Sequence, residues 1–96
     1  MVVFAWDEAK NLSNRAKHKV SFELACRVFD DPLHLSICER VVDGEERWQT
    51  IGQVGGVVIL LVAHTCSDAE DETLIRIISA RKANAHERKQ YEEGID

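Results

Sequence analysis

Two short turn signals, Asp43-Gly44 and Gly55-Gly56, constrain the fold of this chain more than any other feature. The first is typical of a two-residue hairpin turn, and the second separates two further apolar segments. The strands expected around these turns are, in chain order, residues 33–38, Glu46–Val54, Val57–Cys66 and Thr73–Ala80. Because strands joined by short turns pair as neighbours, they should form an antiparallel meander. Val57–Cys66 is apolar on both faces and is therefore expected to be central.

Helices are expected before and after this meander in the sequence, each with a residue that can cap its beginning. Asp7 precedes residues 8–18, Ser21 precedes residues 22–30, and Asn84 forms a capping-box pattern with Glu87 before residues 85–93. The first helix has only a thin apolar stripe, which is Ala9, Leu12 and Ala16. With an opening strand at residues 2–6, the order is β-α-α-β-β-β-β-α. We therefore predict one α+β domain over residues 1–96: an antiparallel meander of four to five strands, with two N-terminal helices and one C-terminal helix packed on one face.

Composition and charge limit the environment and the partners. The chain has 96 residues and three cysteines without CxxC spacing, which favours a reducing, cytoplasmic location over a disulfide framework. Its longest apolar run, Val57–Ala63, is too short to span a membrane, so no membrane partner is expected. The net charge is −5, yet residues 10–19 carry four basic and no acidic side chains, and residues 81–89 carry four basic and one acidic. Acids gather instead in Glu39–Glu46 and in a predicted loop, Asp68–Glu72.

The motifs that are missing narrow the possible chemistry. The sequence has no HxH, HExxH or DxD pattern, no GxSxG elbow and no Gly-rich phosphate loop, so neither a metal site nor a cofactor is expected. Phosphodiester chemistry without a metal remains, in which the 2′-hydroxyl of RNA attacks its own phosphate. Such a site needs a base, an acid and fixed positive charge, which histidine and arginine can supply near neutral pH.

His64, Arg76 and Arg81 are the residues whose positions best fit such a site. His64 closes the central apolar strand, and the two arginines lie on and just past the strand that follows. If these strands pair, His64 comes close to Arg76, but strict alternation places the two arginines on different faces. Each residue also has a structural interpretation. His64 can be a hydrogen-bonded core histidine, Arg76 can pair with an acid such as Glu46, and Tyr91 can anchor the last helix.

Several groups of residues occur in a recognisable order and spacing. They are Phe4-x-Trp6-Asp7-x-x-Lys10 and Asn14-x-x-Lys17-His18-x-Val20-Ser21-Phe22, then Glu45-x-Arg47-Trp48 with Ile51-Gly52 and His64-Thr65, and finally Arg76-Ile77-Ile78-Ser79-Ala80-Arg81 with Glu87-Arg88 and Tyr91. In these features the chain resembles BrnT-type toxins of bacterial type II toxin–antitoxin pairs, from about residue 4 to residue 93.

The resemblance implies a RelE-like fold and a metal-independent endoribonuclease. It also implies neutralisation by a small, co-encoded, DNA-binding antitoxin of the BrnA type. The toxin would then contact operator DNA only through the antitoxin. The residues that it assigns to catalysis are His18, His64, Arg76, Arg81 and Tyr91, with the arginines supplying charge to the phosphate and His64 or His18 transferring protons. The residues that it assigns to the RNA backbone are Lys10, Lys17 and Arg88.

A second function has to be weighed against this one. A non-catalytic binding module, or a degenerate toxin that serves only as antitoxin partner and co-repressor, would need the same basic residues. The acidic balance of the whole chain suits the docking of a basic partner. Histidine and arginine within apolar strands favour the enzyme, because a binding module has no need of them there.

Overall fold

The structure is a computed structural model and describes residues 1–94. Its elements, in chain order, are β1 (Val2–Ala5), α1 (Glu8–His18), α2 (Phe22–Cys26), the 3-10 helix η1 (Arg27–Asp30), β2 (Leu35–Val42), β3 (Glu45–Val54), β4 (Val58–Ala69), β5 (Glu72–Lys82) and α3 (Ala85–Glu93). The predicted order of strands and helices is confirmed. All three predicted N-caps are present, including the capping box of Asn84 and Glu87.

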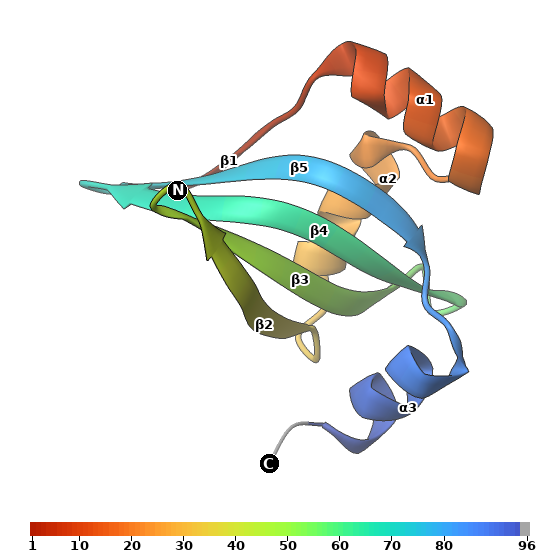
Figure 1. The fold of residues 1–96 in the computed structure, drawn as a ribbon. Coiled ribbons are helices and arrows are strands. Elements are labelled where there is room, and N and C mark those ends of the chain that lie inside the picture. The colour runs from red at the N-terminus through yellow and green to blue at the C-terminus, as the bar shows by residue number, and fades with distance from the viewer. Residues whose placement is uncertain (95–96) are drawn as a thin grey trace.

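The five strands form one sheet in the order β1-β5-β4-β3-β2 (Figure 1). Strands β2 to β5 make the antiparallel meander that the turn signals predict, with β4 central. Strand β1 differs, because it pairs in parallel with β5. The chain leaves β1 through α1 and α2 and re-enters the sheet only at β2, so the first strand can dock beside the last one. The sheet is therefore mixed rather than wholly antiparallel.

The turns follow from their residues, and one predicted loop is shorter than expected. Asp43 and Gly44 both have positive φ, at 52° and 79°, which fits the mirror-image turn of a tight hairpin. The acidic segment Asp68–Glu72, predicted as a loop, is strand at both of its ends. Only Glu70 and Asp71 turn, so β4 extends to Ala69 and β5 begins at Glu72. Charged side chains are compatible with strands here because the hairpin projects into solvent.

The main core lies between the sheet and α2 with η1. Phe22, Ala25 and Val28 are fully buried there, against β4 side chains such as Leu60 and Val62. The predicted helix over residues 22–30 is an α-helix to Cys26 that tightens into η1. Gly52 permits this close packing, because a Cβ at Gly52 would lie 2.6 Å from Cγ1 of Val28.

Helix α1 packs through polar residues, not through its predicted apolar stripe. Its buried residues are Asn11 and Asn14, whereas Leu12 is 57% exposed. Nδ2 of Asn14 donates to the carbonyl of Ala80 at 2.8 Å, and its Oδ1 accepts from the Ala80 amide at 3.2 Å. These bonds occupy the edge of β5 beyond the point where the short β1 ends. The Asn14 side chain thus satisfies the backbone hydrogen bonds that a neighbouring strand would otherwise make with Ala80.

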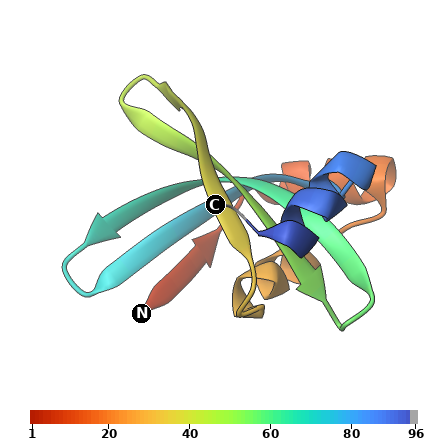
Figure 2. The ribbon, with the colours of Figure 1, turned by 90° about the horizontal axis from the view of Figure 1, so that it is seen from below.

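The prediction that all helices lie on one face is also wrong. Helix α3 lies on the opposite side of the sheet from α2 and η1 (Figure 2) and packs against β3, whereas α1 lies along the edge of β5. On that side Ile51 and Leu61, which pair across β3 and β4, are 2% and 5% exposed. A second, smaller apolar contact therefore forms at one end of this face, and the rest of the face stays open.

Candidate functional site

A bulge in β5 brings two of the predicted arginines to the same face of the sheet. Ala63 of β4 pairs with Ser79, but the next residue, His64, pairs with Ile77, so Ile78 is an extra residue. Beyond the bulge Arg81 pairs with Leu61, and before it Arg76 pairs with Thr65. These β4 partners, Leu61 and Thr65, are four positions apart, so they and the two arginines point to the same face of the sheet. The alternate β4 residues Leu60 and Val62 face α2, so the arginines lie on the opposite face. Four residues of strand separate them, which is about 13 Å.

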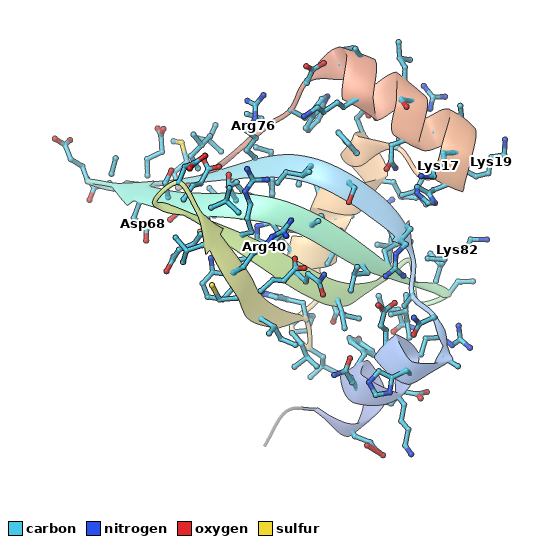
Figure 3. All side chains as sticks on the ribbon, viewed as in Figure 1. Lys17, Lys19, Arg40, Asp68, Arg76 and Lys82 are labelled. Atoms are coloured by element: carbon cyan, nitrogen blue, oxygen red, sulfur yellow. The ribbon has the colours of Figure 1, made fainter. Side chains whose placement is uncertain are left out.

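Arg76 ends a row of arginines that crosses the open face. Arg40 pairs with Arg47, Arg47 with Thr65, and Thr65 with Arg76, so the row takes one residue from each of the strands β2 to β5. We call Arg40, Arg47 and Arg76 the arginine row; Figure 3 shows Arg40 and Arg76, its two ends. Adjacent strands are about 4.8 Å apart, so Arg47 and Arg76 stand about 10 Å apart across Thr65. This spacing allows both side chains to reach one anion.

The charges of the row are only partly neutralised. Nη2 of Arg47 lies 3.4 Å from Oε1 of Glu45. Within residues 1–94, neither Arg40 nor Arg76 forms an ion pair, and both are exposed. Nε of Arg47 is buried and has no hydrogen-bond partner among the described residues. A buried donor without a partner is costly, and an anion bound at the row would satisfy it.

A hollow of about 200 Å³ lies beside the row, at the middle of the sheet. It is lined by two residues from each of four strands: Glu39 and Arg40, Arg47 and Trp48, Ala63 and His64, and Ile78 and Ser79. We call it the central hollow. Two bulges border it, at Ile78 of β5 and at Glu39 of β2, where Cys38 pairs with Trp48 but Arg40 pairs with Arg47. Bulges redirect side chains and are frequent next to active sites.

A second hollow, of about 190 Å³, lies on the other side of the same bulge. Its lining residues are Lys10, Ser13, Asn14, Lys17 and His18 of α1 with Ile78 and Ser79 of β5. We call it the helix hollow. Because both hollows share Ile78 and Ser79, they adjoin each other across β5. Three predicted residues, Lys10, Lys17 and His18, therefore meet here, within one strand's width of the central hollow.

His64 lies within β4, not at its end, and its ring is buried on the α2 side. It is 3% exposed and packs edge-on against Phe29, with ring centroids 5.0 Å apart. Nδ1 lies 3.0 Å from the carbonyl of Thr65, which can only accept, so Nδ1 carries a proton. Nε2 lies 2.7 Å from the hydroxyl of Thr50 and accepts from it. Burial lowers the pKa of His64, so the ring is neutral and both nitrogens are occupied.

Arg81 is engaged by a carboxylate. Its Nη1 and Nη2 donate to Oε1 and Oε2 of Glu87 at 2.7 and 2.9 Å. These hydrogen bonds raise the pKa of Arg81 and lower the pKa of Glu87. Glu87 also accepts from the Asn84 amide in the capping box, at 2.9 Å. The ion pair therefore fixes the start of α3 to the end of β5.

Tyr91 and Arg88 also hold α3 in place. The Tyr91 hydroxyl donates to Oδ2 of Asp31 at 2.5 Å, which raises the pKa of Tyr91 to about 12. Burial acts to raise the pKa of Asp31, but hydrogen bonds from Tyr91 and from the amides of Gln53 and Leu33 outweigh it, and the pKa is lowered. Nη1 of Arg88 donates to the carbonyl of Ala83 at 2.9 Å. The structure thus separates Arg81, Arg88 and Tyr91, which tie down α3, from the arginine row.

Acidic and basic side chains gather at different ends of the sheet. Acids lie at the tips of the β2–β3 and β4–β5 hairpins, where Figure 3 labels Asp68. Lys17, Lys19 and Lys82 lie at the other end (Figure 3). The helix hollow belongs to this basic end, and the arginine row lies between the two ends. An acidic net charge is therefore compatible with a basic surface for a polyanion.

Sequence reasoning missed the functional potential of Arg40 and Arg47. A signal for them was present, because a two-residue turn at Asp43-Gly44 makes Arg40 the direct partner of Arg47. Like charges directly opposite each other are destabilising, and an anion bound between them would relieve the repulsion. The two bulges carried no comparable signal, since each depends on packing across the sheet. Among residues 1–94, no group of three or more His, Cys, Asp or Glu side chains is arranged to hold a metal ion.

Comparisons with known proteins agree with this architecture. A family described as "Ribonuclease toxin, BrnT, of type II toxin-antitoxin system" matches residues 6–87. The crystal structure of the ribonuclease toxin BrnT of Brucella abortus, at 1.1 Å resolution, superposes with a TM-score of 0.60. It is 27% identical in sequence, and the match covers 88% of this chain and 97% of that one. No curated protein matches the sequence.

The family match covers most of the chain, and the similar solved structure has the same α+β architecture. Within the described residues, no helix is both long and apolar enough to cross a membrane. The chain belongs to the BrnT family of ribonuclease toxins of type II toxin–antitoxin systems.

Proposed function

We propose that this toxin is a metal-independent endoribonuclease that binds the scissile phosphate of RNA at the arginine row. The observation that carries the proposal is that Arg40, Arg47, Thr65 and Arg76 occupy directly paired positions on four adjacent strands. The 2′-hydroxyl of the substrate attacks the phosphorus, and two negative charges develop on the phosphate oxygens. Fixed guanidinium groups stabilise that charge more than the single charge of the ground state. DNA lacks the nucleophile and is not cleaved.

The two adjoining hollows give the RNA a path. With the scissile phosphate at the central hollow, the RNA chain crosses β5 at Ser79 and places a neighbouring phosphate in the helix hollow. Lys10 and Lys17 bind this phosphate, and His18 contacts the same segment. A single strand suits a path that bends over the edge of a sheet, whereas a duplex is too stiff and too wide.

The other predicted site residues receive structural roles in this proposal. Arg81, Arg88 and Tyr91 hold α3, and their hydrogen-bond partners lie within the protein. His64 supports the sheet through Thr50 and Thr65. Of the two histidines expected to transfer protons, His64 lines the central hollow, but both of its ring nitrogens are hydrogen-bonded within the protein. His18 lines the helix hollow, and we place it among the RNA contacts.

We further propose that a co-encoded, DNA-binding antitoxin of the BrnA type silences the toxin in the cytoplasm by covering the arginine row. Membership of a type II toxin–antitoxin family supports a protein antitoxin. Both ends of the row are exposed and the row is rich in positive charge, so an acidic segment of such a partner could occupy the phosphate position. Operator DNA then meets the toxin only through the antitoxin.

Induction of the chain alone in bacteria tests the enzymatic proposal. Growth and total RNA integrity are followed for the parent, for an Arg47→Gln/Arg76→Gln variant, and for Lys89→Gln as a charge control on the outer side of α3. We expect growth arrest and RNA fragmentation in the parent and the control, and neither in the double variant. Fragmentation of equal extent in the double variant would remove the arginine row from the site.

One observation favours the alternative, a non-catalytic partner of the antitoxin. Arg81 and Tyr91 are held by carboxylates, and the ring of His64 is buried, so three of the predicted catalytic groups are not free. Purified toxin added to RNA separates the two functions. Intact RNA after prolonged incubation with folded toxin, together with tight antitoxin binding, would establish the binding module.

A further inference from the structure

We infer that Glu39 is the general base that removes the proton from the 2′-hydroxyl of the RNA. The inference deepens the proposed function and rests on it. Glu39 is the residue inserted by the β2 bulge, between Cys38, which pairs with Trp48, and Arg40, which pairs with Arg47. It lines the central hollow together with Arg40, Arg47 and Ser79. Neither the turn signals nor the family resemblance pointed to this residue.

The bulge explains why a carboxylate on this strand reaches the hollow. In a regular strand, neighbouring side chains point to opposite faces, so Glu39 and Arg40 would be separated by the sheet. Because two residues of β2 stand opposite Arg47, the side chain at the inserted position is redirected and borders the same hollow as Arg40. A base and a phosphate-binding cation are thereby adjacent in sequence and border the same hollow.

Other groups around the hollow are less suited to this role. Glu39 is the one carboxylate in the described lining of the central hollow. Glu45, on the neighbouring strand, is paired with Arg47 at 3.4 Å. The ring of His64 is neutral, but both of its nitrogens form hydrogen bonds within the protein. Glu39 is exposed and, within residues 1–94, forms no ion pair, so its oxygens can accept from a substrate hydroxyl.

The proposed step is balanced without a co-reactant other than water. The Glu39 carboxylate takes the proton of the 2′-hydroxyl while the 2′-oxygen forms a bond to phosphorus. The bond between phosphorus and the 5′-oxygen breaks, and that oxygen takes a proton from water. The products are a 2′,3′-cyclic phosphate and a 5′-hydroxyl end, and Glu39 returns its proton to solvent. Arg40 and Arg47 hold the phosphate oxygens throughout.

The test compares cleavage of a short fluorescent RNA by the parent, Glu39→Gln and Glu39→Asp, with Glu46→Gln as control. Glu46 is an exposed acid of the same hairpin that is outside the hollow. We expect Glu39→Gln to lower kcat at least about 100-fold with little change in KM, because general base catalysis contributes about 100- to 10,000-fold. Glu39→Asp should keep intermediate activity, and Glu46→Gln should match the parent. Circular dichroism establishes that each variant is folded.

Two further readouts separate a base from a merely electrostatic role. The pH profile of kcat should differ between the parent and Glu39→Gln, and any limb that belongs to the general base should be absent from the variant. Added formate should restore part of the activity of Glu39→Ala. If Glu39 only weakened RNA binding by its charge, Glu39→Gln would lower KM, leave kcat unchanged and overturn the inference.

The failure of this inference and of the proposed function are distinguishable. If the folded parent leaves RNA intact, the proposed function is wrong and the role of Glu39 is wrong with it. If the parent cleaves RNA and Glu39→Gln cleaves it with the same kcat, only the role of Glu39 is overturned. A 2′-deoxy substitution at the cleaved position identifies the nucleophile, because such a substrate should stay intact with the parent.

Discussion

Arg40 and Arg47 face each other directly across β2 and β3, two like charges at paired positions next to a tight turn. Neighbouring side chains of this kind repel each other, which costs the folded state stability. Glu45 forms an ion pair with Arg47, at 3.4 Å, and leaves the charge of Arg40 uncompensated. Both arginines line the central hollow. An anion placed between the two guanidinium groups would convert the repulsion into binding.

Arg40→Gln should therefore raise stability and lower activity. We expect the free energy of unfolding to rise by about 0.5 kcal/mol, within the range of cross-strand pair effects. RNA cleavage should fall at least about 10-fold, since one of the phosphate contacts is lost. Urea unfolding and a cleavage assay on the same preparation measure both effects, with Lys89→Gln as the control that should change neither. A destabilised Arg40→Gln protein would show that Arg40 serves the fold.

The Arg81–Glu87 ion pair should make the protein sensitive to acid. The hydrogen bonds from Arg81 hold the pKa of Glu87 below its ordinary value of 4.5. A carboxylate with a lowered pKa stabilises the fold above its unfolded pKa, and this contribution disappears as pH falls through the folded value. The free energy of unfolding should thus fall below about pH 4.5, and less steeply in Glu87→Gln. Urea titrations between neutral and acid pH measure the slope, and Glu92→Gln, an exposed acid of the same helix, should retain the parent's slope.

Local signals predicted the strands, the turns and the caps, because each depends on neighbours in sequence. Asp43-Gly44 specified the hairpin, and Asn84 with Glu87 specified the start of α3. The side of the sheet that α3 covers was not predictable in this way. It depends on Tyr91 reaching Asp31, a contact between residues sixty positions apart. Likewise, the apolar stripe of α1 gave no hint that Asn14 would pair with the edge of β5.

The candidate site was predictable only in part, for a related reason. Arg76 stood out because it interrupts an apolar strand, and the structure places it at the end of the arginine row. Strict alternation was the wrong guide for Arg81, since the bulge at Ile78 shifts the face of every residue after it. A bulge has no fixed sequence pattern when no glycine is involved. Glu39 was hidden by the same kind of irregularity.

Tyr91 should make the fold sensitive to alkaline pH. The hydrogen bond to Asp31 raises the pKa of Tyr91 from 10.0 to about 12. The folded state thus favours the protonated phenol, so this contribution is complete below pH 10 and is lost between pH 10 and about 12. Tyr91→Phe should be less stable at neutral pH by about 1 kcal/mol and should lack this alkaline loss. Thermal unfolding of both proteins across that range measures the difference.

The same variant separates the two roles considered for Tyr91. If the hydroxyl only positions α3, RNA cleavage should decline in proportion to the unfolded fraction and be near the parent's level well below the melting temperature. Complete loss of cleavage in folded Tyr91→Phe would instead assign the hydroxyl to the reaction.

Asn14→Ala should be strongly destabilising, although α1 is mostly exposed. The side chain is 8% exposed and bonds to the Ala80 amide and carbonyl and to the Val20 carbonyl, at 2.8 to 3.2 Å. Removal leaves these buried backbone groups without partners, at about 3 kcal/mol in total. Chemical unfolding measures the loss, and Ser13→Ala, its exposed neighbour on α1, should lose less than about 0.5 kcal/mol. An Asn14→Ala protein as stable as Ser13→Ala would mean that α1 is held by other contacts.

Lys10 and Lys17 should contribute to RNA affinity in a manner that depends on salt. Both line the helix hollow and lie one helical turn on either side of Asn14, which fixes α1 to β5. Each phosphate contact to single-stranded nucleic acid adds about 0.7 to the slope of log affinity against log salt concentration. In Lys10→Gln/Lys17→Gln, the slope should therefore fall by about 1.4. Fluorescence anisotropy with a 2′-O-methyl RNA, which cannot be cleaved, measures it. Arg27→Gln/Lys89→Gln removes the same charge outside both hollows, so an equal loss of slope in this control would mean that RNA responds to net charge alone.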